Sequence, residues 1–314
     1  MSFPLLNIYR VIKLEATADW DAPITDSAKG AWYLELLARH VRLSTYVFLA
    51  LFYHYTFDMD WAKTLSPGWI AWVFARNYLV MVAMYGGWHW FLFESAYAAV
   101  MKTKKFNAKM PSGEQMFRDR LFTTLGFTQS SVWEVTMLHA WASGSEWVKP
   151  YYTDFWAYPL WSIFQVLLIG YWRDGHFYWI HRFMHPWKTT IIPDVGQFMY
   201  DHVHSLHHKS YITAPWSGLA MHPVEHLFYY SCTLLPMVWS LHPFHFWMNK
   251  IHADISPLPG HDGHDSPAGG SYFHHIHHAK YEYNYGTPMV PFDKLFGTYQ
   301  DGSKWEKEGV KKKN

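Results

Sequence analysis

The sequence predicts an all-α integral membrane protein, in which transmembrane helices and helical hairpins carry a cytosolic, histidine-rich helical cap that holds a dinuclear metal site. Three observations predict this fold class. Hydrophobic residues make up 50% of the 314 residues and charged residues only 16%, whereas soluble domains usually carry roughly 25% charged residues. Several apolar stretches are long enough to cross about 30 Å of hydrocarbon. Eighteen of the 22 histidines lie between His176 and His278.

The chain is expected to form one domain over residues 1–314, because no Pro/Gly/Ser-rich linker divides it. This domain comprises N-terminal helices and a basic loop (1–120), hairpins with the histidine-rich region (121–302) and a basic tail (303–314). A mean hydropathy of −0.16 is compatible with a membrane protein, since the abundant Trp and Tyr residues favour the bilayer interface. Cys232 is the only cysteine, which excludes an internal disulfide and a thiolate metal site. The net charge of +1, without a basic patch interleaved with aromatic residues, argues against nucleic acid as a partner.

The first thirty residues carry charges without an uninterrupted apolar core, so no cleavable signal peptide is visible. Residues 5–14 fit a short interfacial helix or, equally, a docked amphipathic helix. Four candidate spans follow, at residues 43–57, 69–100, 121–171 (in two pieces around Pro150) and 227–248. Lysines and arginines cluster between residues 102 and 120 and in the tail. By the positive-inside rule, both basic regions and the histidine region should face the cytosol.

Two of these stretches are expected to be hairpins. The histidines before and after residues 227–248 must meet at one site, so this stretch cannot simply cross to the opposite face. Pro236 lies near its middle, where it would break a helix and leave two halves that are each too short to span the bilayer. The same argument predicts two passes in residues 121–171, joined around residues 145–150.

Ten histidines form four spaced sets: His181/His185, His204/His207/His208, His222/His226 and His274/His277/His278. Each set closes with a four-residue separation, which places two imidazoles on one face of a helix. Imidazole suits iron, copper, nickel and zinc, and ten ligands suit two ions at five each. Core histidines normally occur singly, so the pattern predicts a metal-binding array. His176, His202, His261 and His264 lie near these sets and are expected only to tune hydrogen bonding.

Over residues 171–302 this spacing resembles that of the fatty acid hydroxylase and sterol desaturase superfamily, which are integral membrane oxygenases. Asp174 and the segment 177–185 resemble the family's Asp-x3-Tyr-Trp-x-His-Arg-x2-His box. Residues 204–209 resemble the second box. The element His222-Pro223-Val224-Glu225 resembles that of sterol C4-methyl oxidases. The last box is followed by Tyr283-Asn284-Tyr285-Gly286 and by residues 292–298, much as in sterol C5 desaturases.

The resemblance implies a non-haem di-iron membrane oxidoreductase. Two iron ions would be held by the ten histidines, with O2 as co-substrate and an unactivated C–H bond of a sterol or fatty-acyl lipid as the point of attack. Asp174 and Glu225 are expected to orient ligand imidazoles, and His252 to be a further ligand or an outer partner. The chain has no His-Pro-Gly-Gly haem segment. By family analogy, electrons would therefore come from an external donor, cytochrome b5 with an NAD(P)H-dependent reductase.

Other functions stay open at this point. The chain fits a non-catalytic structural or lipid-binding subunit of a membrane complex that retains the fold and the metal site. It also fits a zinc-dependent membrane hydrolase, which would need a general base near the metal. The substrate is open too, because His-Pro-x-Glu favours C4-methyl oxidation whereas Tyr-Asn-Tyr-Gly favours C5 desaturation. The tail Lys311-Lys312-Lys313-Asn314 resembles a retrieval signal for the endoplasmic reticulum and, equally, a solvated basic tail.

Overall fold

A computed structural model of the protein describes residues 32–102, 105–107, 109–264 and 270–303. Over these ranges the regular structure is helical, with a single isolated β-bridge between Lys105 and His264 and no strand. The predicted all-α fold class is therefore confirmed for this part of the chain. The helix expected at residues 5–14 and the basic tail with its dilysine pattern lie outside the described residues.

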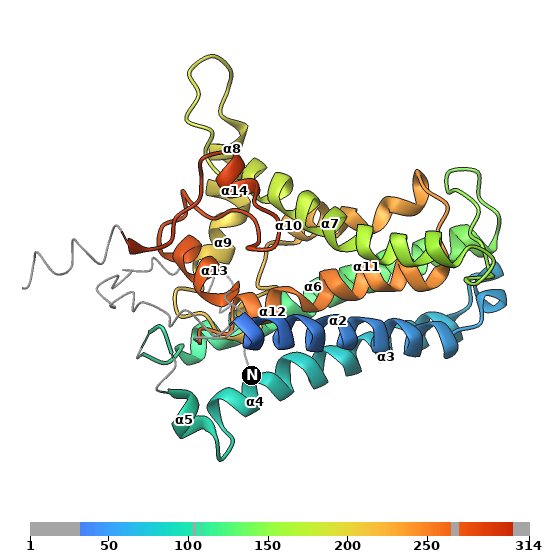
Figure 1. The fold of residues 1–314 in the computed structure, drawn as a ribbon, viewed down its shortest axis with the longest axis horizontal. Helices are drawn as coiled ribbons and strands as arrows, with labels where there is room; N and C mark the ends of the chain where they lie inside the picture. Colours follow the sequence, from blue (N-terminus) through green and yellow to red (C-terminus); the bar gives the residue numbers. More distant parts are fainter. Residues whose placement is uncertain (1–31, 103–104, 108, 265–269, 304–314) are drawn as a thin grey trace, which may run out of the picture.

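Five long helices run side by side as an elongated bundle (Figure 1). Helix α11 packs against both α2 and α7, and α6 packs against α3. The five are α2 (Trp32–Tyr55), α3 (Pro67–Met81), α6 (Gly113–Ala142), α7 (Pro159–Phe183) and α11 (Pro243–Ile255). Shorter elements connect them: η1 (Met59–Lys63), the π-helix η2 (Val82–Gly86), α4 (Gly87–Phe93), α5 (Ala98–Lys102), η4 (Pro215–Ser217), α10 (Pro223–Tyr230) and η5 (Ser231–Met237).

The starts of several helices follow from the local sequence. Helices α3, α7, α10 and α11 each begin at a proline, whose fixed φ suits the first helical turn and whose missing N–H would have no partner there. The histidine before two of these prolines caps the helix. His222 Nδ1 accepts the N–H of Val224, and His242 Nδ1 accepts the N–H of Phe244. In each case Nδ1 of the histidine acts as the N-cap acceptor of the following helix.

Both predicted chain reversals are present. Helices α6 and α7 are joined by residues 143–158, and α10 with η5 is joined to α11 by residues 238–242. The second turn comes a few residues after Pro236, because this proline is accommodated inside the 3-10 helix η5. Figure 1 shows that α10 leads away from the end of the bundle where α9 and α13 lie, and that α11 returns toward this end.

The interior of the bundle contains charged side chains that balance one another. Arg76 of α3 and Lys250 of α11 both contact Glu134 of α6, and Lys250 Nζ also lies 2.6 Å from Asp254 Oδ2. All four side chains are buried. Such a pairing satisfies charges that would be costly to bury alone. Over the described ranges, no helix combines the length and the apolar character that crossing a membrane requires.

A cap of short helices covers one end of the bundle, at the left of Figure 1. It consists of α8 (Val195–Met199), the π-helix η3 (Tyr200–His204), α9 (Ser205–His208), α12 (Pro257–Gly260), α13 (Gly270–Ala279) and α14 (Phe292–Leu295). Helix α7 reaches this cap with its last turn, which contains His181. The hairpins therefore bring segments that are far apart in the sequence to one end of the molecule.

Candidate metal centre

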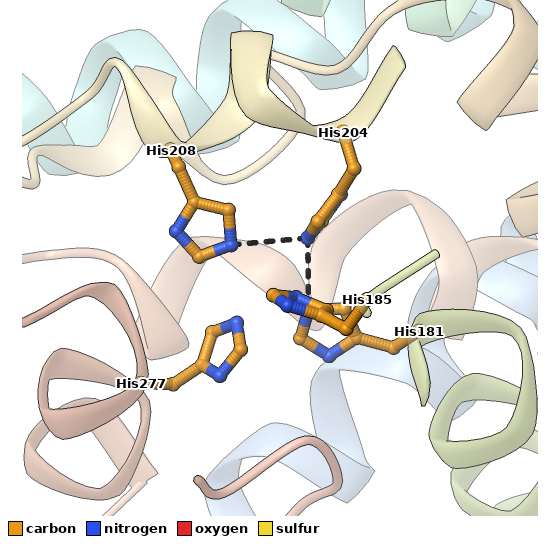
Figure 2. A group of neighbouring side chains, drawn as sticks. All are labelled: His181, His185, His204, His208 and His277. Carbon is orange, nitrogen blue, oxygen red and sulfur yellow. Dashed lines mark hydrogen bonds between the residues drawn. The ribbon is translucent and has the colours of Figure 1, made fainter. Parts of the chain in front are cut away.

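Nine buried histidines form two groups at the junction of the bundle and its cap, and within each group the ligand nitrogens lie within 4.8 Å of one another. Figure 2 shows the five imidazoles of the first group facing a common centre. The first group comprises His181, His185, His204, His208 and His277, and the second comprises His207, His261, His274 and His278. All nine side chains are buried.

Helical spacing distributes the histidines between the two groups. Residues four apart share a helix face, whereas the residue between them faces sideways. His204 and His208 accordingly belong to the first group and His207 to the second; in α13, His274 and His278 belong to the second group and His277 to the first. The groups are adjacent, with ring centroids of His207 and His208 separated by 5.8 Å. Each of the two histidine triplets, His204/His207/His208 and His274/His277/His278, therefore contributes ligands to both groups.

Backbone carbonyls fix the tautomers of three of these histidines. Nδ1 lies 2.6 Å from the Tyr285 carbonyl in His181, 2.7 Å from the Tyr283 carbonyl in His277 and 2.7 Å from the Pro257 carbonyl in His261. A carbonyl can only accept, so each Nδ1 carries a proton and, in a neutral ring, each Nε2 is a bare lone pair. Burial keeps such rings neutral, because it lowers the pKa of His261 to about 4 and that of His277 well below its ordinary value.

The bare nitrogens converge. His181 Nε2 lies 3.1 Å from His204 Nε2, which is itself 3.1 Å from His208 Nε2. His261 Nε2 lies 2.9 Å from His274 Nε2 and 3.1 Å from His207 Nε2. One proton satisfies at most one such contact, and among the described residues His277 Nε2 and both ring nitrogens of His278 have no hydrogen-bond partner. A cation in each group would bind these lone pairs, and all-imidazole sites suit iron, copper, nickel or zinc.

The segment Tyr283–Gly286 orients two of the ligands through its carbonyls, which sequence reasoning did not foresee. The carboxylate of Asp293 holds this segment, since its two oxygens accept the N–H groups of Tyr285 and Gly286, each at 2.8 Å. Asn284 adopts a left-handed φ of 57° and donates its amide to the Phe273 and Gln300 carbonyls. Asn tolerates this conformation better than most residues. The resemblance of residues 283–286 and 292–298 to one family was the signal that could have revealed this role.

The predicted outer-sphere residues have different outcomes. Glu225 Oε1 lies 2.7 Å from His204 Nδ1, with both groups buried, so this carboxylate contacts a grouped histidine as expected. Asp174 lies about two turns before His181 in α7, and its side chain lines the adjoining cavity. His252 stacks on Tyr46 at a centroid distance of 5.0 Å. Among the described contacts, neither Asp174 nor His252 reaches a grouped histidine, because each side chain faces the adjoining cavity instead.

The structure brings together eight of the ten predicted ligands and leaves His222 and His226 outside both groups. His222 caps α10 with its Nδ1. His226 Nε2 lies 3.1 Å from the Leu219 carbonyl, and the ring packs on Gly126 of α6, where a Cβ would lie only 2.7 Å from that nitrogen. Both side chains are therefore committed to local structure.

His261 belongs to the second group, although it was not among the ligands predicted from the sequence. It was expected only to tune hydrogen bonding, as extra histidines near a metal site often do. It stands 13 residues before His274, outside any helical repeat. Helix α12 ends at Gly260 and turns the next residue, His261, toward His207. The second group thus depends on a loop contact that periodicity cannot reveal. His275, in contrast, packs against Phe106 at 4.9 Å.

A cavity of about 440 Å³ adjoins both histidine groups. His181, His204, His207, His261 and His274 form part of its wall. Most of the remaining wall is apolar, and it extends to Leu43 of α2 and to Leu167 and Tyr171 of α7, which are exposed. Its size and character suit one elongated apolar ligand.

Comparisons with known proteins identify a family match and relatives for the part of the chain that contains the grouped histidines. The fatty acid hydroxylase family model matches residues 166–298. Among curated proteins, a Delta(7)-sterol 5(6)-desaturase of Aspergillus fumigatus is 31% identical over 154 residues, covering 46% of this chain and 41% of the relative. A very-long-chain aldehyde decarbonylase of Oryza sativa is 30% identical over 158 residues, covering 46% of this chain and 56% of the relative.

A Delta(7)-sterol 5(6)-desaturase of Gibberella zeae is 26% identical over 164 residues, covering 48% of this chain and 40% of the relative. The chain thus spans about half the length of the curated relatives it matches. No solved structure matches it significantly. The matched segment contains all nine grouped histidines. Residues 166–298 are thus similar to the fatty acid hydroxylase family, and the relatives matched over this region include sterol desaturases.

Proposed function

We propose that this protein is an O2-dependent lipid hydroxylase or desaturase that binds two iron ions in its two histidine groups. One observation carries the proposal: two adjacent, buried, all-imidazole groups present bare nitrogens beside an apolar cavity. Sterol desaturases and an aldehyde decarbonylase among the relatives support lipid oxidation. The most suitable substrates are a sterol or a fatty-acyl lipid.

The donor set fits a dinuclear centre. The five histidines of the first group would hold one ion and the four of the second group the other. When bound, iron would supply the reduction of O2 and the removal of hydrogen from an unactivated C–H bond. The Tyr283 and Tyr285 carbonyls keep a proton on the outer nitrogens of His277 and His181, so that the inner nitrogens stay available. Glu225 would likewise keep a proton on Nδ1 of His204, because a cation at Nε2 of this histidine would favour the ionised form of the Glu225 carboxyl group.

The cavity wall would place the reacting carbon and keep water away from it. Apolar side chains such as Phe177, Met221 and Phe273 line the cavity near the histidines. They hold a lipid chain by burial of apolar surface, and they fix its position relative to the ligands. Electrons would come from an external donor, which we propose to be cytochrome b5 with an NAD(P)H-dependent reductase.

We propose further that the bundle is embedded in a membrane, with the cap on the cytosolic side of the endoplasmic reticulum. Large apolar side chains are exposed on the outer faces of its helices, including Phe48 (69% exposed) on α2, Leu79 (66%) on α3 and Leu160 (84%) on α7. Exposed apolar surface of this extent is typical of a lipid or protein interface. Four charged residues of α3, α6 and α11 face inward and are paired with one another: Arg76, Glu134, Lys250 and Asp254.

Metal analysis of protein purified in mild detergent tests the proposal. After anaerobic iron loading, we expect about two irons per chain with only nitrogen and oxygen neighbours, measured by elemental analysis and X-ray absorption. His207→Ala should remove metal and turnover. His139→Ala should change neither, because its ring only contacts the Ala62 carbonyl. One tightly bound zinc that iron cannot replace, together with an unchanged lipid profile in cells lacking the protein, would contradict the oxygenase.

A further inference from the structure

A buried arginine interrupts the apolar wall of the cavity. Arg173 of α7 lines this cavity and is only 3% exposed. The guanidinium carbon lies 4.6 Å from the centroid of the Tyr229 ring, so the cation is stacked on an aromatic face. Stacking leaves the edge of the guanidinium, which carries the N–H donors, for other partners.

These donors are poorly satisfied within the described part of the chain. Nε and Nη1 of Arg173 have no hydrogen-bond partner there, and none of the ion pairs found among the described residues involves Arg173. The neighbouring Asp174 also lines the cavity. Burial, the larger effect, raises the pKa of its carboxyl group and the Arg173 charge lowers it, but the two side chains form no ion pair. The buried arginine of the bundle interior, Arg76, contrasts with it, because Arg76 is paired with Glu134.

A buried cation without an ion-pair partner in direct contact is costly, because burial removes its water and leaves N–H donors unsatisfied. A ligand with an anionic oxygen group would remove this cost, and a planar guanidinium matches a carboxylate or phosphate in a two-pronged contact. Arg42 on α2 adds a second positive charge to the wall of the same cavity. The wall thus contains two arginines, Arg42 and Arg173, together with the two acidic residues Asp174 and Glu225.

We propose that Arg173 anchors the acidic head group of the lipid substrate. This inference rests on the proposed function, because that function says which reaction the bound lipid undergoes. The binding of the head group by Arg173 does not depend on it. Arg173 and His181 are both on α7, and their eight-residue separation corresponds to about 12 Å along the helix axis. A lipid anchored in this way presents to the histidines a carbon well along its chain and not the carbon next to its head group. The substrate class is thus an acyl lipid with a carboxylate or phosphate head group.

Direct binding tests this assignment without requiring turnover. The probes are a long-chain fatty acid, a lysophosphatidic acid of the same chain length, the methyl ester of the fatty acid, and a sterol, each titrated into detergent-purified protein. The two acidic lipids should bind more tightly than the ester and the sterol, and the better of the two identifies the head group. Arg173→Met should weaken binding of the acidic lipid about 10- to 100-fold, as expected for a hydrogen bond to a charged group, and should leave ester binding nearly unchanged.

The stability of the lipid-free protein provides a second measurement: Arg173→Met should weaken lipid binding but should not lower stability. Replacing an unpaired buried charge by an apolar side chain of similar length should leave the melting temperature of Arg173→Met equal or raise it. Arg120→Gln removes an exposed arginine outside the cavity and should change neither binding nor stability. A lower melting temperature together with equal losses for acid and ester would show a packing role and overturn the proposal, as would preferential binding of the sterol. Binding of the acid without its oxidation would instead count against the proposed reaction alone.

Discussion

Asp293 should control both the stability of the cap and the affinity of the first histidine group. Its buried carboxylate accepts the N–H groups of Tyr285 and Gly286 and the hydroxyl of Thr298, at 2.6 to 2.8 Å. Alanine at this position would leave two buried N–H groups without an acceptor, at about 1–3 kcal/mol each. We therefore expect Asp293→Ala to lower the free energy of unfolding by roughly 2–6 kcal/mol.

The variant Asp293→Asn keeps the volume of the side chain and changes only the hydrogen bonds that hold the Tyr285–Gly286 segment. Its amide can still accept the N–H of Tyr285 but would turn a donor toward the N–H of Gly286. The Tyr285 carbonyl would then hold the His181 ring less firmly, and we expect metal affinity to fall about 10- to 100-fold, as for other outer partners of metal ligands.

Metal affinity measured by chelator competition, together with thermal unfolding, tests both variants. Asp154→Asn is the matched control, because Asp154 also accepts two backbone N–H groups but is exposed in the connection between α6 and α7. It should leave metal affinity unchanged. Unaltered metal affinity in Asp293→Asn would refute the argument that this carboxylate acts through the Tyr285 carbonyl.

Three further outcomes are expected. His261→Ala should lower the metal content by about one ion per chain, whereas His226→Ala should keep both ions, as elemental analysis would show; the reverse pattern would restore the ligand set expected from the sequence. Gly126→Ala should destabilise the protein by roughly 1–3 kcal/mol in thermal unfolding, because the new Cβ meets His226 Nε2 at 2.7 Å. Gly68→Ala has open space and should not destabilise; equal effects at both glycines would argue against the packing of His226. The third outcome concerns pH: burial lowers the pKa values of His207, His208 and His278, so below about pH 6.5 the unfolded chain binds more protons than the folded one. The stability of metal-free protein should then fall as the pH drops from about 7 to about 5, and a flat profile of melting temperature against pH would contradict this.

Much of the site could be predicted from local spacing. The four-residue separations in residues 204–208 and 274–278 determine which imidazoles share a helix face, because the helical period is a local property. The structure places these triplets, with His181 and His185, in two groups. The hairpins were predictable for a similar reason. Ligands on both sides of an apolar stretch must meet, and the residues between α6 and α7 and between η5 and α11 provide the turns.

The tertiary structure decided what depends on contacts between distant residues. His222 and His226 carry the same i, i+4 signal as the other sets, but one caps α10 and the other packs on Gly126. His261 has no periodic signal and joins the second group only because α12 ends beside α9 and α13. The roles of the Tyr285 carbonyl and Asp293 depend on backbone geometry that side-chain patterns do not encode. Spacing along a helix therefore determines which faces histidines share, whereas long-range packing determines which of those faces meet.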